Sequence, residues 1–78
     1  MKIYDYNGKK NITGPIIKKL RKERKITQSE LADILCDKGV LIERDSVSRI
    51  EIGTRFVADY ELRALAEIFE CEIKDLFP

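Results

Sequence analysis

The sequence predicts an all-α fold, in which 78 residues form one compact domain of five helices. Two observations lead to this fold class. Apolar residues recur at the spacing of helices that bury one face. The chain also has two cysteines, no histidine and no cluster at metal-ligand spacing, so helix packing must hold the core without a disulfide framework, a metal or another cofactor.

Residues 1–13 are predicted to form an N-terminal arm or edge strand ahead of a helical domain at residues 14–78. The run Ile-Tyr-Asp-Tyr at residues 3–6 is typical of a strand, and the Asn-Gly pair at residues 7–8 is typical of a turn. No linker or low-complexity segment divides the rest of the chain, so we expect one compact unit.

The first helix is expected to begin at Gly14-Pro15 and to end at about Lys25. Proline suits an early helical position because the donor that it lacks would have no partner there. The inward residues of this helix are Ile16, Ile17 and Leu20. Its outer face carries Lys18, Lys22 and Lys25.

The second helix begins with a capping box, Thr-Gln-Ser-Glu. The Thr27 hydroxyl can accept from the Glu30 amide, and the Glu30 carboxylate can accept from the Thr27 amide. The residues that would face the core are Leu31, Ala32, Ile34 and Leu35. Lys38 and Gly39 provide a basic last turn and a stop, so this helix is expected to end there.

A third helix has its start signal between Glu43 and Asp45 and closes at Gly53. Val47 and Ile50 stand at the three-residue spacing of a buried face. The fourth helix is expected from Asp59, as its cap, to about Phe69. Its core stripe comprises Leu62, Leu65, Ala66 and Phe69. A fifth, short helical turn ends in Leu76 and Phe77.

Several runs of residues occur here in the order typical of one known family. They are Arg-Lys-Glu-Arg before the second helix, Thr-Gln-Ser-Glu-Leu-Ala in it, Val-Ser-Arg-Ile-Glu-x-Gly in the third, Leu-Arg-Ala-Leu-Ala-Glu-Ile-Phe in the fourth, and Ile-Lys-Asp-Leu-Phe at the end. The chain thus resembles the helix-turn-helix proteins of the Cro and lambda-repressor type, also called Xre-like. The resemblance implies a lambda-repressor-like DNA-binding domain.

Two features depart from the family pattern. The connector from Cys36 to Ser46 is longer than the family's usual turn, and it includes the apolar run Val-Leu-Ile at residues 40–42. Ile52 stands where the family commonly has an asparagine, and Glu70 where it usually has a glycine. The phosphate contact of that asparagine side chain is therefore not carried over to this chain.

The resemblance assigns candidate DNA contacts, because the start of the third helix would enter the major groove, where donors and acceptors distinguish base pairs. Its candidate base contacts are Arg44, Asp45, Ser46 and Arg49. Asp45 could equally be only an N-cap. The candidate phosphate contacts are Gln28, Ser29, Thr54 and Arg55, with longer-range attraction from Lys18, Lys22 and Lys25. The match also implies a structural ion pair between Arg21 and Glu51.

Charge is distributed unevenly, although the formal net charge is only +1. Residues 1–27 contain nine Lys and Arg against two acids, which gives +7, whereas the remaining residues have a charge of −6. Such a molecule can present a positive face to phosphates. The alternative is that the first helix simply has a solvated, charged side.

The function expected from these features is a sequence-specific, repressor-like transcriptional regulator that binds double-stranded DNA, as a homodimer. The alternative is a protein-interaction module, such as an antitoxin or adaptor, built on the same core. A second apolar line on the fourth helix, Tyr60, Ala64 and Ile68, is either a dimer seam or a surface that packs on the N-terminal segment or Phe56. An enzyme is not expected, since no phosphate cradle or nucleophile and base arrangement is present.

We expect a cytoplasmic protein that does not bind membranes. No apolar run approaches the length of a membrane span, and the first residues lack the hydrophobic block of a secretion signal. Cys36 and Cys71 are interpreted as small buried hydrophobic residues in a reducing compartment.

Overall fold

The computed structural model describes residues 6–78, which contain four α-helices and one short 3-10 helix. In chain order these are α1 (Gly14–Glu23), α2 (Gln28–Asp37), α3 (Arg44–Ile52), α4 (Asp59–Ile68) and η1 (Ile73–Leu76). The all-α class is confirmed, because this part of the chain has no strand. The fifth expected helix is a single 3-10 turn of four residues, so the count of five helices reduces to four α-helices.

The predicted strand at residues 3–6 lies outside the described residues except for Tyr6. Tyr6 and Lys9 exchange two backbone hydrogen bonds of 2.7 and 2.9 Å and close a tight turn. Asn7 and Gly8 between them both have positive φ, which asparagine and glycine adopt more readily than other residues. The turn at residues 7–8 is therefore confirmed.

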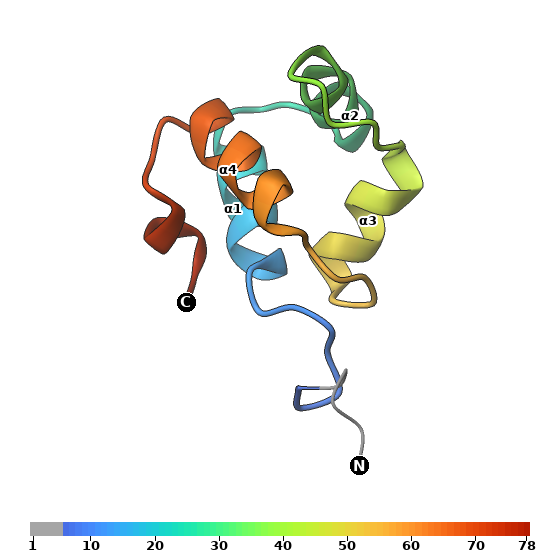
Figure 1. Cartoon of the computed structure of the whole chain (residues 1–78), viewed down its shortest axis with the longest axis vertical. Helices are drawn as coiled ribbons and strands as arrows, with labels where there is room; N and C mark the ends of the chain where they lie inside the picture. The colour runs from blue at the N-terminus through green and yellow to red at the C-terminus, as the bar shows by residue number, and fades with distance from the viewer. Residues whose placement is uncertain (1–5) are drawn as a thin grey trace.

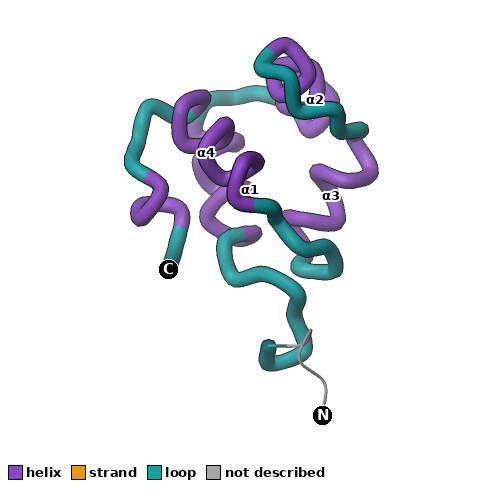
Figure 2. Tube along the Cα trace, in the orientation of Figure 1, coloured by secondary structure: helices purple, strands orange, loops and turns teal. Residues whose placement is uncertain are grey.

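The helices are arranged with α3 at one edge of the molecule and η1 at the opposite edge (Figure 1). α3 packs on both α1 and α2, and η1 packs on α4. The loops between the helices are short, and the segment before α1 extends away from the helical body (Figure 2). This arrangement leaves one side of α3 on the surface.

The core lies where the four helices meet. Its fully buried side chains are Ile17, Leu31, Leu35, Val47, Leu65 and Leu76. Ala32, Ile50, Ala66 and Phe69 are also buried, as their spacing predicted, whereas Ile16, Leu20, Ile34 and Leu62 are half-buried. Helical periodicity therefore identified the buried faces correctly.

The connector between α2 and α3 is anchored by alternate residues. Val40 and Ile42 are 8% and 7% exposed and belong to the core, whereas Leu41 between them is 87% exposed. In an extended segment successive side chains point in opposite directions. Burial of Val40 and Ile42 therefore places the Leu41 side chain in solvent. The connector thus packs on the core and presents a single apolar side chain.

The helix ends follow local hydrogen bonding. The Thr27 capping box is confirmed, with Glu30 N to Thr27 Oγ1 at 3.0 Å and Thr27 N to Glu30 Oε1 at 2.7 Å. Gly53 ends α3 in the left-handed region, as predicted. The expectation that Asp59 caps α4 was wrong, because Ala58 holds the cap position and its amide donates to Glu61 Oε1 at 2.9 Å.

The interpretation of Cys36 as a buried residue was also wrong, because its side chain is exposed. It follows buried Leu35 by one residue on α2 and so falls outside the core-facing stripe. Cys71 is half-buried, and both thiols are free. Burial raises the pKa of the Cys71 thiol.

Within residues 6–78, no helix has the length and apolar character needed to cross a membrane. The same residues contain no group of three His, Cys, Asp or Glu that could hold a metal ion.

Candidate nucleic-acid interface

A buried ion pair anchors the inner side of α3 to α1. Arg21 Nε lies 2.6 Å from Glu51 Oε2, and Arg21 Nη2 lies 3.2 Å from Glu51 Oε1. Both residues are less than a tenth exposed. Arg21 Nη1 also donates to the carbonyl of Ile26 at 2.8 Å. Two parallel hydrogen bonds orient the Arg21 guanidinium and the Glu51 carboxylate relative to each other. This pair therefore fixes the position of α3 on α1.

Gln28 joins the start of α2 to both ends of α3. Its Nε2 donates to Glu51 Oε1 at 3.0 Å, and its Oε1 accepts a long hydrogen bond of 3.5 Å from Arg44 Nη1. The Gln28 side chain, expected to contact a phosphate, therefore has its amide group engaged within the protein. Its backbone amide and that of Ser29 remain at the N-terminal end of α2, where helix amides lack intrahelical partners.

Arg44 and Asp45 open α3 as a pair on the surface. Arg44 Nη2 lies 2.6 Å from Asp45 Oδ1, and both side chains are more than half exposed. The alternative that Asp45 is an N-cap was wrong, since Glu43 holds the cap position and Asp45 is the second residue of the helix. An exposed ion pair contributes only about 0 to 1 kcal/mol to stability, so Arg44 or Asp45 can leave this pair and bind another group instead.

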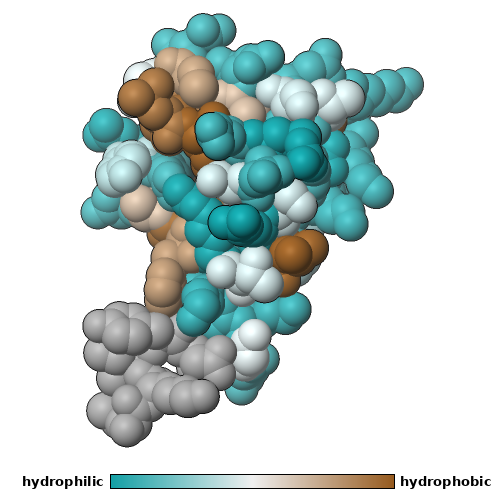
Figure 3. All heavy atoms as spheres, turned by 90° about the vertical axis from the view of Figure 1, so that its right-hand side faces the viewer, coloured by the Kyte–Doolittle hydropathy of each residue, from teal (hydrophilic) through white to brown (hydrophobic). Residues whose placement is uncertain are grey.

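Arg49 lies one turn further along α3, on the same side as Asp45. Its side chain is exposed and makes no hydrogen bond or ion pair within residues 6–78. Ser46 is half-buried, whereas Val47 and Ile50 are buried on the opposite side of the helix. Figure 3 views the molecule from the side of α3 and shows a largely hydrophilic surface. α3 therefore combines an anchored inner side with an outer side that offers hydrogen-bond donors.

The loop after α3 is fixed by an ion pair between Arg55 and Glu61. Arg55 Nη1 and Nη2 lie 2.9 and 3.0 Å from Glu61 Oε1 and Oε2. The hydrogen bond with Glu61 raises the pKa of Arg55. Burial by itself would raise the pKa of Glu61, but the hydrogen bonds from Arg55 and the Ala58 amide outweigh it and lower that pKa. Arg55, expected to contact a phosphate, is thus directed toward α4 instead.

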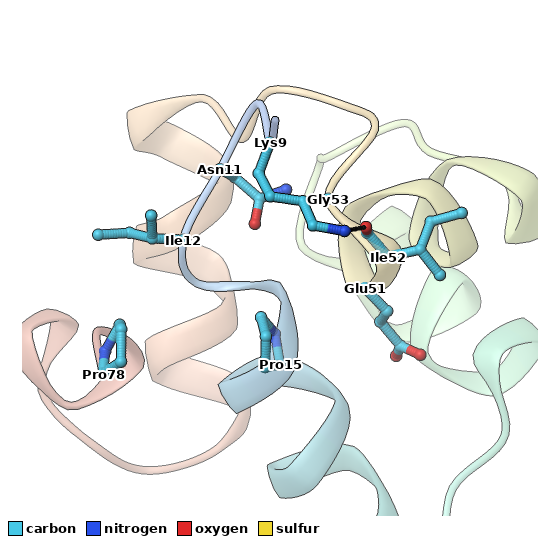
Figure 4. Close-up of a pocket in the computed structure, with 8 residues that line it drawn as sticks. All are labelled: Lys9, Asn11, Ile12, Pro15, Glu51, Ile52, Gly53 and Pro78. Atoms are coloured by element: carbon cyan, nitrogen blue, oxygen red, sulfur yellow. Dashed lines mark hydrogen bonds between the residues drawn. The ribbon is translucent and has the colours of Figure 1, made fainter. Parts of the chain in front are cut away.

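The N-terminal segment contacts the C-terminal end of α3, which the sequence did not predict. Asn11 Nδ2 donates to the carbonyls of Ile50 and Arg55 at 3.0 and 2.7 Å, and Asn11 Oδ1 accepts from the Gly14 amide at 2.8 Å. Lys9 Nζ donates to the Ile52 carbonyl at 3.1 Å (Figure 4). The carbonyl partners of Lys9 and Asn11 are about forty residues away in sequence, so no local pattern could reveal these contacts.

Gly14 allows α1 and α3 to approach closely. A Cβ atom at this position would lie 2.2 Å from the Ile50 carbonyl oxygen, well inside contact distance. The glycine is therefore required by the packing of α1 on the end of α3, in addition to its place at the start of a helix.

A groove of about 490 Å³ lies beside these contacts, between the N-terminal segment and the end of α3. Its apolar lining comes from Ile12, Pro15, Ile52 and Pro78 (Figure 4). The polar lining residues Lys9, Asn11 and Glu51 are all paired within the chain. The groove thus presents apolar surface without the converging polar groups that fix a small ligand.

The remaining candidate residues lie on α1, just after its end, and on α4. Lys18, Lys22 and Lys25 are all exposed. Lys25 lies beyond the end of α1 and has positive φ, so the first helix ends earlier than expected. On α4, Tyr60 is 57% exposed and Ile68 is half-buried, but Ala64 is 5% exposed and belongs to the core. Ala64 is therefore not available to a second copy of the chain.

The sequence and the fold of this chain are similar to those of known helix-turn-helix proteins. A helix-turn-helix family model matches residues 17–76. Among solved structures, the crystal structure of the DNA-binding domain of BldD is similar, with a TM-score of 0.68 and 18% sequence identity over 86% of this chain and 90% of that chain. At this identity the likeness shows the fold alone. No curated protein sequence matches the chain significantly.

Proposed function

The chain belongs to the Cro/C1-type helix-turn-helix family, and we propose that it is a sequence-specific, repressor-like transcriptional regulator that reads the major groove of DNA with α3. One observation carries this proposal. The outer side of α3 presents the exposed Arg49, whose side chain has no partner among residues 6–78, one turn from the Arg44–Asp45 pair, while Arg21 and Glu51 hold the inner side in place.

The base contacts of this proposal come from the first six residues of α3. Arg49 forks onto O6 and N7 of a guanine, because a guanidinium matches these two acceptors. Arg44 provides a second guanidinium. Asp45 either orients this guanidinium, or accepts a hydrogen bond from a cytosine amino group and thereby releases it. Ser46 adds a hydroxyl beside them. Guanidinium groups at two places on one helix would favour a half-site that contains guanines.

Contacts to phosphates hold α3 in register. The backbone amides of Gln28 and Ser29 point outward from the positive end of α2, where a phosphate is favoured. Thr54 provides a hydroxyl in the loop after α3, and long-range attraction comes from Lys18, Lys22 and Lys25. These contacts fix the position of the protein without selecting a base sequence.

We further propose a homodimer, because two copies would place two recognition helices on one face of DNA, about 34 Å apart. The apolar surface that supports it on α4 is exposed Tyr60 together with half-buried Ile68. Such a protein would act in the cytoplasm.

Selection of bound sequences from a random DNA pool tests the proposal. Recovery of one inverted repeat, with half-sites about one helical turn apart, is the expected result. Recovery of a single half-site would support DNA reading by a monomer and contradict the dimer. A pool that remains random, together with no retention on DNA at low salt, would contradict the proposed function.

A protein-interaction module remains the second candidate function, and exposed Leu41 favours it. This large apolar side chain is 87% exposed, four residues before the acidic Asp45 in the sequence, and offers surface to a protein rather than to phosphates. A DNA column distinguishes the two functions. Retention that falls as salt rises supports DNA binding, whereas salt-independent failure to bind with a co-purifying protein supports the alternative.

A further inference from the structure

We propose that Asn11 is a positioning residue for DNA reading. Its side chain clamps the turn at the end of α3 and so holds Arg49, a proposed base contact, in a fixed relation to Thr54, a proposed phosphate contact. This inference rests on the proposed function, although Asn11 itself contacts no DNA in it. It assigns a role to part of the segment that the sequence identified only as an arm or edge strand.

The Asn11 side chain ties three parts of the backbone together. Its Nδ2 donates to the Ile50 carbonyl at 3.0 Å and to the Arg55 carbonyl at 2.7 Å. Its Oδ1 accepts from the Gly14 amide at 2.8 Å (Figure 4). The two hydrogens of one amide group thus hold two carbonyls on either side of the turn, and the oxygen of the same group joins them to the start of α1.

The clamped turn carries two of the proposed DNA contacts. Arg49 directly precedes Ile50, Thr54 directly precedes Arg55, and the side chains of Arg49 and Thr54 are exposed. The Thr54 amide donates to the Arg49 carbonyl at 2.9 Å. The Thr54 hydroxyl donates to the same oxygen only at the long distance of 3.4 Å, so a phosphate can replace this partner. Each donor of the clamp therefore holds the backbone next to one proposed DNA contact.

The turn depends on such a clamp because Gly53 lies in its middle. Gly53 has a φ of 88°, in the left-handed region, and a glycine backbone has more conformational freedom than that of any other residue. Glu51 is anchored to α1 before this glycine, and Arg55 is anchored to α4 after it. Asn11 joins these two anchored parts across Gly53.

A loose turn would affect specific binding more than nonspecific binding. Phosphate contacts set the register of a protein on DNA, and a guanidinium reads guanine only when it meets both O6 and N7. Groups that bind in this way must be held within about 0.5 Å of their productive geometry. Nonspecific binding depends on charge instead and tolerates such displacements. Loss of the clamp should therefore reduce the preference for one sequence and leave the general affinity for DNA unchanged.

Asn11→Ser tests the proposal in the whole chain. The variant is neutral and retains an oxygen that can accept from the Gly14 amide, but its side chain is too short to donate to both carbonyls. The probes are the duplex recovered by selection from the random pool and a duplex of the same bases in scrambled order. Affinity for the selected duplex should fall about tenfold, within the discrimination that one bidentate base contact provides. Affinity for the scrambled duplex and its salt dependence should not change, because the substitution removes no charge.

Leu76→Val is the control for lost stability, because it shortens a buried side chain on η1, at the edge opposite α3 (Figure 1). Both variants are measured at a temperature at which circular dichroism shows them folded. The control should keep the wild-type ratio of affinities for the two duplexes. An unchanged ratio in folded Asn11→Ser would overturn the positioning role and leave Asn11 with a structural role only.

Hydrogen exchange in the unmodified protein keeps the proposal testable if Asn11→Ser does not fold. Because coupling is reciprocal, a clamp that strengthens specific binding is itself strengthened, by the same factor, when the specific site binds. The Nδ2 hydrogens of Asn11, followed by NMR, should therefore exchange about tenfold more slowly with the selected duplex than with the scrambled one. Equal exchange with both duplexes would overturn the proposal although the protein reads DNA. A wild-type chain that binds both duplexes equally would instead overturn the proposed function, and the role of Asn11 with it.

Discussion

Arg21 and Glu51 face each other through two hydrogen bonds across the contact between α1 and α3, with Nε and Oε2 2.6 Å apart. Gln28 donates to the same Glu51 carboxylate at 3.0 Å. One buried carboxylate on α3 is thus held by a residue from each of the two helices that precede it. Glu51 therefore joins the start of α2 to the inner side of α3.

Glu51→Ala should strongly destabilise the protein. The substitution leaves the Arg21 guanidinium buried without its counter-charge, which typically costs about 3–5 kcal/mol. Urea unfolding followed by circular dichroism measures the loss. Lys74→Ala breaks an exposed pair with Glu72 and is the control, which should change stability by less than about 1 kcal/mol. Equal small effects of both substitutions would show that the buried pair does not anchor α3.

Acid should weaken the Arg55–Glu61 link. The pKa of Glu61 is lower in the folded protein than its ordinary value of 4.5, so the ionised carboxylate stabilises the fold above that value. This contribution is lost as the pH falls below about 4.5 and through the lowered pKa. Unfolding free energies measured from pH 7 to pH 3 should decline, and the decline should be smaller in Glu61→Gln. A Glu61→Gln curve parallel to that of the wild type would contradict this assignment.

Gly14→Ala should destabilise the protein although alanine is the better helix former. The added methyl would lie 2.2 Å from the Ile50 carbonyl oxygen, which is backbone and cannot move aside cheaply. We expect a loss of about 1–3 kcal/mol, as for other overpacked sites. Lys19→Ala on the exposed side of the same helix is the control and should be nearly neutral. A stabilised Gly14→Ala variant would mean that α1 and α3 separate easily at this point.

The sequence predicted the helices well because their signals are local. The Thr27 box, the Gly53 stop and the apolar stripe that includes Leu31 and Leu35 each involve residues within a few positions of one another. The capping of α3 by Asn11 could not be predicted in this way, since the fold alone brings a residue 39 positions away to the Ile50 carbonyl.

The candidate site was harder to predict, because the use of a polar side chain depends on its neighbours. Arg55 was expected to contact a phosphate, but Glu61 engages its guanidinium once α4 turns back toward the loop. Gln28 was assigned the same role, yet its amide binds Glu51 and Arg44. Composition and spacing reveal that such groups are polar, whereas only the fold shows which of them are already paired.

Leu41→Ser should leave stability within about 0.5 kcal/mol of the wild type, because the side chain is 87% exposed. Val40→Ser, one residue earlier, should lose considerably more, because it places a hydroxyl in the core. Thermal unfolding compares the two variants. If Leu41→Ser also leaves DNA affinity unchanged but abolishes binding of a co-purifying protein, the protein-interaction function gains support. A large loss of stability in Leu41→Ser would contradict the exposed position of this side chain.

Arg49→Ala tests the proposal that α3 reads DNA, once a specific site has been selected. Arg49 is exposed and its side chain has no partner within residues 6–78, so its removal should change the interface without disturbing the fold. Affinity for the selected site should fall by about 1–3 kcal/mol, and discrimination should relax at one base pair.

Lys22→Ala is the comparison, because removal of a phosphate attraction weakens binding to all DNA sequences alike and makes affinity less dependent on salt. Competition binding against duplexes substituted at each position separates these two patterns. Because a phosphate contact cannot distinguish bases, a uniform loss in Arg49→Ala would place this arginine on the DNA backbone and move the reading surface toward Arg44.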